Sequence, residues 1–363
     1  MKKETESTLI GFILKEWLLI SSLIGLILTS IYVKRLPVYS LSEFQILFIL
    51  FSLFITIKGL ELSGIISLVS QIIQKRKSIP LKLITATFFL SMFITNDVAL
   101  IVIVPLTLSL EIKHKDIIVI FETLAANAGS ALTPFGNPQN LFIYWFYNLD
   151  PVVFVTAIAP FSLFFLLFLI VFSFFIKTDN NYTKKLNIEK NLNKKSVYVY
   201  IFLFIIVLLT VLHILPVSTN ILIIIYALLF NRKSLKIDYA LLFTFFCFFG
   251  FAENVKFLLS SKIIHSTHIF LFSALASQIM SNVPVALLFA KFTTNWKALL
   301  WGTNVGGFGS LFGSLANLIA YKIYVAQNDT KNSGIFLLKF HVIEYIAFFL
   351  GIALYFILKI CMI

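Results

Sequence analysis

The chain has 363 residues, of which 60% are hydrophobic and only 12% are charged, and phenylalanine alone accounts for 41 of them. A soluble domain is about half apolar and about a quarter charged. The composition therefore excludes a soluble enzyme, a disordered chain and a fibrous repeat. It predicts an all-α polytopic membrane protein whose surface lies mostly in lipid.

The formal net charge of +13 does not indicate nucleic-acid binding, because the lysines and arginines fall between apolar runs and not on one amphipathic face. Loops rich in basic residues belong on the cytoplasmic side of a membrane. We therefore expect an integral protein of a prokaryotic cytoplasmic (inner) membrane, with its N-terminus in the cytoplasm, lipid around it and no nucleic-acid partner. The segments assigned to the cytoplasmic side are the N-terminus, 74–82, 111–116, 177–195, 231–236 and 322–334.

A helix needs about 20 apolar residues to cross the bilayer core. Two of the apolar runs, 117–147 and 298–324, contain several glycines or prolines and are predicted to be broken helices. In chain order, the expected crossings lie near 16–33, 43–60, 117–147, 151–176, 197–215, 217–230, 238–252, 298–324 and 336–359.

Two further apolar segments, 81–110 and 268–292, carry polar clusters at their centres, Thr95-Asn96-Asp97 and Ser281-Asn282-Val283-Pro284. The apolar run on either side of each cluster is too short to span the bilayer. Both segments are therefore predicted to be re-entrant helical hairpins. Their polar tips should lie near the midplane, where non-helical backbone must be buried in protein or line a watery cavity.

The chain contains an internal repeat, since residues 127–147 and 304–324 match without a gap. Apolar composition accounts for chance matches of Leu and Phe, but not for asparagines and glycines paired in register. An odd number of predicted crossings separates the two hairpins, so the two copies should be inverted, as in secondary transporters. The matched pairs are Asn127/Asn304, Gly129/Gly306, Phe135/Phe312, Gly136/Gly313, Asn140/Asn317, Leu141/Leu318, Tyr144/Tyr321 and Tyr147/Tyr324.

The repeat predicts three parts of the chain. The first repeat is 1–176, with hairpin 81–110 and broken helix 117–147. A basic cytosolic linker, 177–195, follows. The second repeat is 196–363, with hairpin 268–292 and broken helix 298–324.

The broken helices offer ligands for ions. The first half of 117–147 should end near Gly129 and leave unpaired carbonyl groups, which suit a cation. The second half should restart at Asn137-Pro138, because Asn is a good N-cap and Pro is favoured at the first helical position. Its free N–H groups suit an anion. Ser314 should cap the restart in the second repeat, and the hairpin arms after Asn96 and Asn282 should also begin with free N–H groups.

This pattern predicts one ion site in each repeat, with a cation bound beside an anion. Asp97 is expected to tune coupling to Na⁺ or H⁺, and Glu122 is a second candidate for proton coupling. The first site is Asn96, Asn127, Gly129, Asn137 and Asn140, and the second is Ser281, Asn282, Asn304, Gly306, Ser314 and Asn317. The solute should contact Thr95, Asn96, Asn137, Ser281, Asn282 and Ser314. No cofactor is expected, and no metal beyond a coupling Na⁺.

The runs Phe93–Leu106 and Ala126–Asn140 resemble the ion transporter superfamily, which includes divalent anion:sodium symporters, citrate transporters, arsenite permeases and a sodium/proton antiporter branch. The resemblance extends over nearly the whole chain. It implies alternating access by a hairpin-bearing unit that moves against a scaffold, often in a homodimer.

In the sodium–dicarboxylate branch of that superfamily, each hairpin tip carries a Ser-Asn-Thr triplet that contacts carboxylate and sodium. Here Asn96 and Asn282 match the triplet, while its third position holds Asp97 and Val283. The chain in this respect looks closer to the arsenite-permease-like anion permeases.

The sequence thus predicts a secondary active transporter of a small anion or oxyanion, coupled to Na⁺ or H⁺, and not an enzyme. One alternative is a Na⁺/H⁺ antiporter on the same fold, with Asp97 as the ion carrier. An ion-conducting channel is an alternative of another class. A membrane-embedded enzyme is disfavoured because no acid/base pair lies at matched depth.

Overall fold

The computed structural model describes residues 16–64, 78–110, 112–176, 194–259, 268–327 and 333–361. Within these ranges every regular element is a helix, which confirms the predicted all-α class. The predicted linker 177–195 falls outside the described residues except for its last two, which begin a helix.

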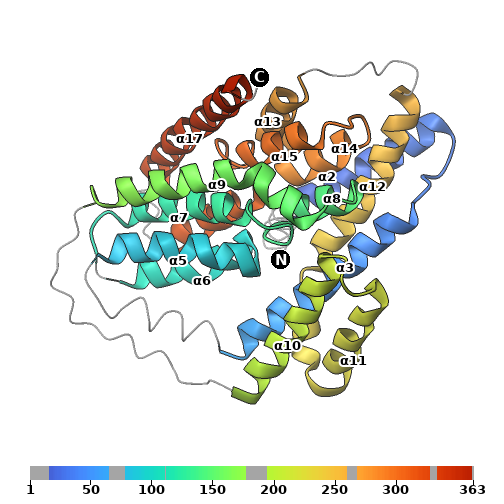
Figure 1. The fold of residues 1–363 in the computed structure, drawn as a ribbon, viewed down its shortest axis with the longest axis horizontal. Helices are drawn as coiled ribbons and strands as arrows, with labels where there is room; N and C mark the ends of the chain where they lie inside the picture. Colours follow the sequence, from blue (N-terminus) through green and yellow to red (C-terminus); the bar gives the residue numbers. More distant parts are fainter. Residues whose placement is uncertain are drawn as a thin grey trace, which may run out of the picture.

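One group of helices forms what we call the framework. In it, α2 packs against α12, and α10 and α11 pack against α3. In Figure 1 these helices run from the bottom of the molecule to its right side. The framework consists of α2 (Trp17–Val33), α3 (Leu41–Leu62), α10 (Lys194–Val211), η1 (Val217–Asn220), α11 (Ile221–Phe230), η2 (Arg232–Leu235) and α12 (Tyr239–Leu259).

The remaining helices form what we call the site unit. Two segments of the chain contribute the same order of elements: a helical hairpin, a broken helix and one long helix. The first segment supplies α5 (Ile79–Ile94), α6 (Asn96–Ser109), α7 (Lys115–Ser130), α8 (Pro138–Phe146) and α9 (Pro151–Ser173). The second supplies α13 (Ile269–Met280), α14 (Asn282–Ala290), α15 (Trp296–Val305), α16 (Leu315–Gln327) and α17 (Ser333–Cys361).

Five helices in the described ranges are long and apolar enough to cross a membrane: α3, α9, α10, α12 and α17. They coincide with the crossings predicted near 43–60, 151–176, 197–215, 238–252 and 336–359. The segment predicted to cross at 217–230 has the predicted bounds and consists of the 3₁₀ turn η1 and a ten-residue α-helix. Ten helical residues rise only about 15 Å against a hydrocarbon core of about 30 Å, so this segment is not one of the five, and its crossing stays a prediction.

Both hairpins turn at a hydroxyl residue in an unusual backbone conformation. Thr95 has φ 78° and ψ 151°, and Ser281 has φ 70° and ψ 151°. Each conformation ends one helix and begins the next at the following asparagine. The backbone N–H groups of Asn96 and Asn282 donate to the carbonyl oxygens of Gly136 and Gly313, at 3.1 and 3.0 Å.

The expectation of free N–H groups is therefore wrong for the first residue of each arm, because the loop of each broken helix supplies a carbonyl acceptor. The predicted restarts of the broken helices are confirmed. Asn137 caps α8 by accepting the Asn140 N–H at 2.9 Å, and Pro138 is the first residue of that helix. Ser314 accepts the Ala316 N–H at 3.2 Å, at the start of α16.

Glycines bring each broken helix against an arm of its hairpin. A Cβ atom on Gly129 of α7 would lie 2.2 Å from the carbonyl oxygen of Phe88 in α5. A Cβ on Gly306, which follows α15, would lie 2.5 Å from the Ser277 Cβ in α13. Close helix packing through small residues, which is common in membranes, explains both positions. The ion-binding role predicted for these glycines stays a prediction.

We expect Gly129→Ala to lower the free energy of unfolding by about 1–3 kcal/mol, because the added methyl group must displace backbone. The matched control is Gly334→Ala in α17, where a Cβ meets nothing within 4 Å. Thermal unfolding in detergent, followed by size-exclusion chromatography, measures both variants. Equal melting temperatures for the two would contradict the proposed packing role.

Candidate functional site

A narrow cavity lies where the two hairpin tips, both broken helices and the framework meet. Its wall contains the first residues of four helices: α6, α8, α14 and α16. The lining residues are Leu18, Asn96, Asp97, Pro138, Gln139, Leu241, Thr244, Ser281, Asn282, Val283, Pro284, Ser314 and Leu315. The volume of the cavity, measured as the space open to the centre of a water molecule, is ≈20 Å³. On this measure one buried water needs about 10–15 Å³, so the cavity has room for about one water.

The electrostatics of this cavity follow from the four helix starts. The N-terminal end of a helix carries a partial positive charge of about half an elementary charge, together with N–H groups that have no intrahelical partner. Four such ends at one cavity favour an anion through their dipoles. Asp97 is the exception, since it places a carboxyl group in the same wall. Several of the first N–H groups of these helices already have acceptors, namely those of Asn96, Asp97, Asn140, Asn282 and Ala316.

Beside the cavity, asparagines from the two broken helices bind one another in a reciprocal pattern. Asn127 of α7 donates to Asn317 Oδ1 of α16 at 2.8 Å. Asn304 of α15 donates to Asn140 Oδ1 of α8, also at 2.8 Å. Because Asn127 matches Asn304 and Asn140 matches Asn317 in the sequence repeat, the two bonds are equivalent. Such exchange is expected of two copies related by a two-fold axis, although the inverted orientation stays a prediction.

The N-cap residues of α8 and α16 extend this exchange. Ser314 Oγ donates to Asn127 Oδ1 at 3.1 Å, and Asn137 Nδ2 donates to Asn304 Oδ1 at 3.5 Å. Asn96 breaks the symmetry, because its Nδ2 donates to Asn127 Oδ1 at 3.1 Å. The sequence predicts two separate ion sites, whereas the structure joins their asparagines into one buried network. The reason is that the two broken helices cross at their breaks.

The structure places the predicted residues in two zones. Asn96, Asp97, Ser281, Asn282 and Ser314 line the cavity. Asn127, Asn137, Asn140, Asn304 and Asn317 lie behind it in the network and are at most 4% exposed. Thr95 is also buried, at the first hairpin tip. The solute and ion contacts of these residues stay predictions.

The two acidic candidates lie in different places. Asp97 is half-buried at the cavity, and its Oδ1 atom has no hydrogen bond. Glu122 is fully buried in α7, where its Oε1 accepts the hydroxyl of Thr107 from α6 and its Oε2 has no partner. Glu122 is not among the residues that line the cavity.

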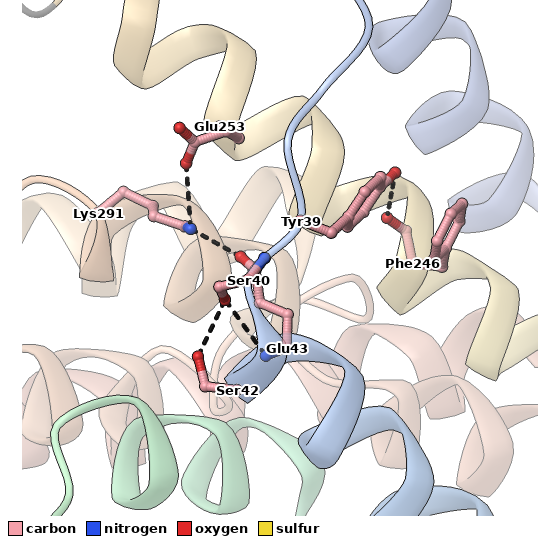
Figure 2. Close-up of polar contacts among 7 residues, drawn as sticks. All are labelled: Tyr39, Ser40, Ser42, Glu43, Phe246, Glu253 and Lys291. Atoms are coloured by element: carbon pink, nitrogen blue, oxygen red, sulfur yellow. Dashed lines mark hydrogen bonds and ion pairs between the residues drawn. The ribbon is translucent and has the colours of Figure 1, made fainter.

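Sequence reasoning missed a buried ion-pair cluster that joins the second hairpin to the framework (Figure 2). Lys291, just after α14, places its Nζ 2.6 Å from Glu43 Oε1 in α3 and 3.2 Å from Glu253 Oε2 in α12. Glu43 Oε2 accepts the Ser40 N–H at 2.7 Å, so both oxygens of this 1% exposed side chain are bonded. A lysine at the end of an apolar arm gives no local signal for such distant partners.

Tyr39 fixes the connection that leads into this cluster (Figure 2). Its ring stacks on Phe246 with the centroids 4.4 Å apart, and its hydroxyl donates to the Phe246 carbonyl at 3.3 Å. Burial raises the pKa of the Tyr39 phenol to about 12. The hydroxyl therefore keeps its proton and its hydrogen bond throughout the neutral pH range.

We expect Lys291→Met to lower the free energy of unfolding by about 3–5 kcal/mol, because it leaves Glu43 buried without its counter-charge. The matched control is Lys58→Met, whose pair with Glu61 joins side chains that are 31% and 36% exposed. Breaking that pair should cost at most about 1 kcal/mol. Thermal unfolding in detergent tests both variants, and adding Glu43→Gln to Lys291→Met should recover part of the loss. Equal effects of the two lysine changes would contradict this assignment.

Comparison with known proteins places the chain in a family. The family model described as "Citrate transporter" matches residues 9–301, which include both hairpins and the first break. An uncharacterized transporter of Methanocaldococcus jannaschii, MJ0456, is 35% identical over 87% of this chain and 90% of its own length. The inner membrane protein YbiR of Escherichia coli is 34% identical over 76% of this chain and 77% of its own length. The chain is therefore a membrane transporter that belongs to the citrate transporter family.

Proposed function

We propose that this protein is a secondary active transporter that moves a small carboxylate or oxyanion together with a cation, Na⁺ or H⁺, by alternating access. The observation that carries the proposal is the convergence of four helix starts on one cavity. Helix starts attract an anion, and in secondary transporters broken helices present such ends to substrates near the bilayer midplane. The description of the family favours a carboxylate within this class of solutes.

The chemistry of the cavity wall supports reversible binding. None of its lining residues is Lys or Arg, so a bound anion would be held by backbone dipoles and by the hydroxyl and amide groups of Ser281, Asn282 and Ser314. A transported solute must bind well enough to enter and weakly enough to leave. Partial charges meet this requirement better than a buried full ion pair would.

Asp97 supports the co-transport of a cation. Its carboxylate would repel an anion in the same cavity. Asp238, just before α12, acts on it as a second negative charge. A cation or proton at Asp97 would remove this repulsion, and binding of the solute would then require binding of the cation.

The small volume of the cavity supports a change of conformation during transport. Space for about one water does not accommodate a solute with several carboxylate groups. Leu18 of α2 and Leu241 and Thr244 of α12 form the framework side of the cavity. Entry of such a solute therefore requires the hairpin tips to separate from α2 and α12.

Asn304→Ala should abolish uptake, or reduce it by about tenfold or more, because it leaves the buried Asn140 Oδ1 without its donor. The measurement is uptake by proteoliposomes of radiolabelled citrate, succinate, phosphate and arsenite, with Na⁺ and pH gradients varied separately. Asn254→Ala is the matched control. Asn254 is equally buried, but its amide donates to Ser30 and Thr29 within the framework, so uptake should stay within about twofold of wild type.

Other outcomes of the same assay separate the alternatives. Wild-type uptake by Asn304→Ala would reject the role assigned to the asparagine network. A pH-dependent Na⁺ flux that needs no anion would identify a Na⁺/H⁺ antiporter instead. Fluxes that only dissipate an imposed gradient, and never concentrate a solute, would identify a channel.

A further inference from the structure

The middle of α17 contains a carboxyl group that no ion pair explains. Glu344 is 0% exposed, and neither of its carboxyl oxygens has a well-formed hydrogen bond. The backbone N–H of Gly309, in the loop between α15 and α16, approaches the carboxyl group only as a weak donor. Sequence reasoning missed this residue, although a single acidic residue inside a long apolar helix is itself a signal of function.

Other fully buried acidic side chains in the described ranges have partners. Glu43 binds Lys291 and the Ser40 N–H, and Glu122 accepts the hydroxyl of Thr107. An ionised carboxylate without a counter-charge is strongly disfavoured in an apolar interior, whereas the neutral acid is tolerated. Glu344 therefore has to carry a proton or a bound cation while it occupies this position.

No charged group of the surrounding helices offers Glu344 compensation. The helices that pack against α17 include α7, α9 and α15, and rings of α17 also stack on rings of α13 and α16. Among their residues, Asp116 already pairs with Lys339 at 2.5 Å, and α9 has no ionisable side chain. The ionisable residues of these helices, of the position before α13 and of α17 are Lys115, Asp116, Glu122, His268, Lys297, Tyr321, Lys322, Tyr324, Lys339, His341, Tyr345, Tyr355 and Lys359.

Hydrogen bonds connect the neighbourhood of Glu344 to the asparagine network. Gly309, with φ +95°, is followed by Ser310, whose N–H donates to Gln278 Oε1 at 2.8 Å. The carbonyl of Ser310 accepts from Asn317 Nδ2 at 2.9 Å, and Asn317 in turn accepts from Asn127. Two consecutive hydrogen bonds therefore link the loop beside Glu344 to Asn127 at the first break.

We propose that Glu344 binds a coupling proton at a second site besides Asp97, an inference that rests on the transport function proposed above. A proton from water on one side of the membrane would bind the carboxylate and give the neutral acid. The neutral acid would then release the proton to water on the other side. An O–H bond is formed and then broken, and no other bond changes. A proton suits this position better than Na⁺, which needs several oxygen ligands around it.

The test compares wild type with Glu344→Gln in proteoliposomes whose membrane potential is clamped. The radiolabelled solute is whichever member of the panel (citrate, succinate, phosphate and arsenite) the wild-type protein accumulates. When the pH outside the vesicles is one unit lower than inside, each coupled proton can raise the ratio of internal to external solute by up to about tenfold. Glu344→Gln should reduce this ratio to about one, because the amide cannot bind and release a proton. Exchange of solute between equal pools should continue, since a neutral side chain still permits the conformational change.

The matched control is Glu61→Gln, since the Glu61 side chain is 36% exposed and the variant should accumulate solute like wild type. Proton-driven accumulation by Glu344→Gln would overturn the inference, as would wild-type accumulation that responds to Na⁺ and not to pH. Loss of exchange in both Glu344→Gln and Glu344→Ala would also overturn it, by showing a structural role. A wild type that accumulates no member of the panel would instead reject the proposed function.

Discussion

The site unit depends on one physical constraint: amide groups buried in a membrane protein must find partners inside the protein. Asn127 and Asn304 satisfy this constraint in part across the repeat, each with an asparagine of the other broken helix. Neither broken helix could bury its asparagines alone without leaving unsatisfied polar groups. The network therefore holds both breaks together, and with them the helix starts that form the cavity.

The site unit and the framework are joined in a different way. Within the site unit, neutral side chains exchange hydrogen bonds, and glycines allow backbones to touch. At the boundary with the framework, Lys291 binds carboxylates from α3 and α12. The same boundary also contains apolar and hydrogen-bonded contacts. The ring of Phe142 in α8 lies 5.6 Å from that of Phe249 in α12, measured between centroids, and Trp145 Nε1 donates to the Val211 carbonyl at 3.1 Å.

Local sequence signals predicted much of this fold. Proline and asparagine at 137–138 and serine at 314 mark helix restarts because capping depends on neighbouring residues only. The hairpin tips could be located for the same reason, from polar clusters inside apolar runs. Local sequence signals could not predict the bond from Asn127 to Asn317 or its counterpart from Asn304 to Asn140. These bonds depend on which helices cross in space. The partners of Lys291 and the isolation of Glu344 likewise follow from packing between distant segments.

The two hairpin tips carry a consequence for engineering. Thr95 and Ser281 hold positive φ angles, and a residue other than glycine in such a conformation stores about 1–3 kcal/mol of strain. Glycine would adopt the same turn with little strain, but it would remove the hydroxyl group at each hairpin tip. A search for thermostable variants would therefore select against the two hydroxyl groups that are expected to contact the solute.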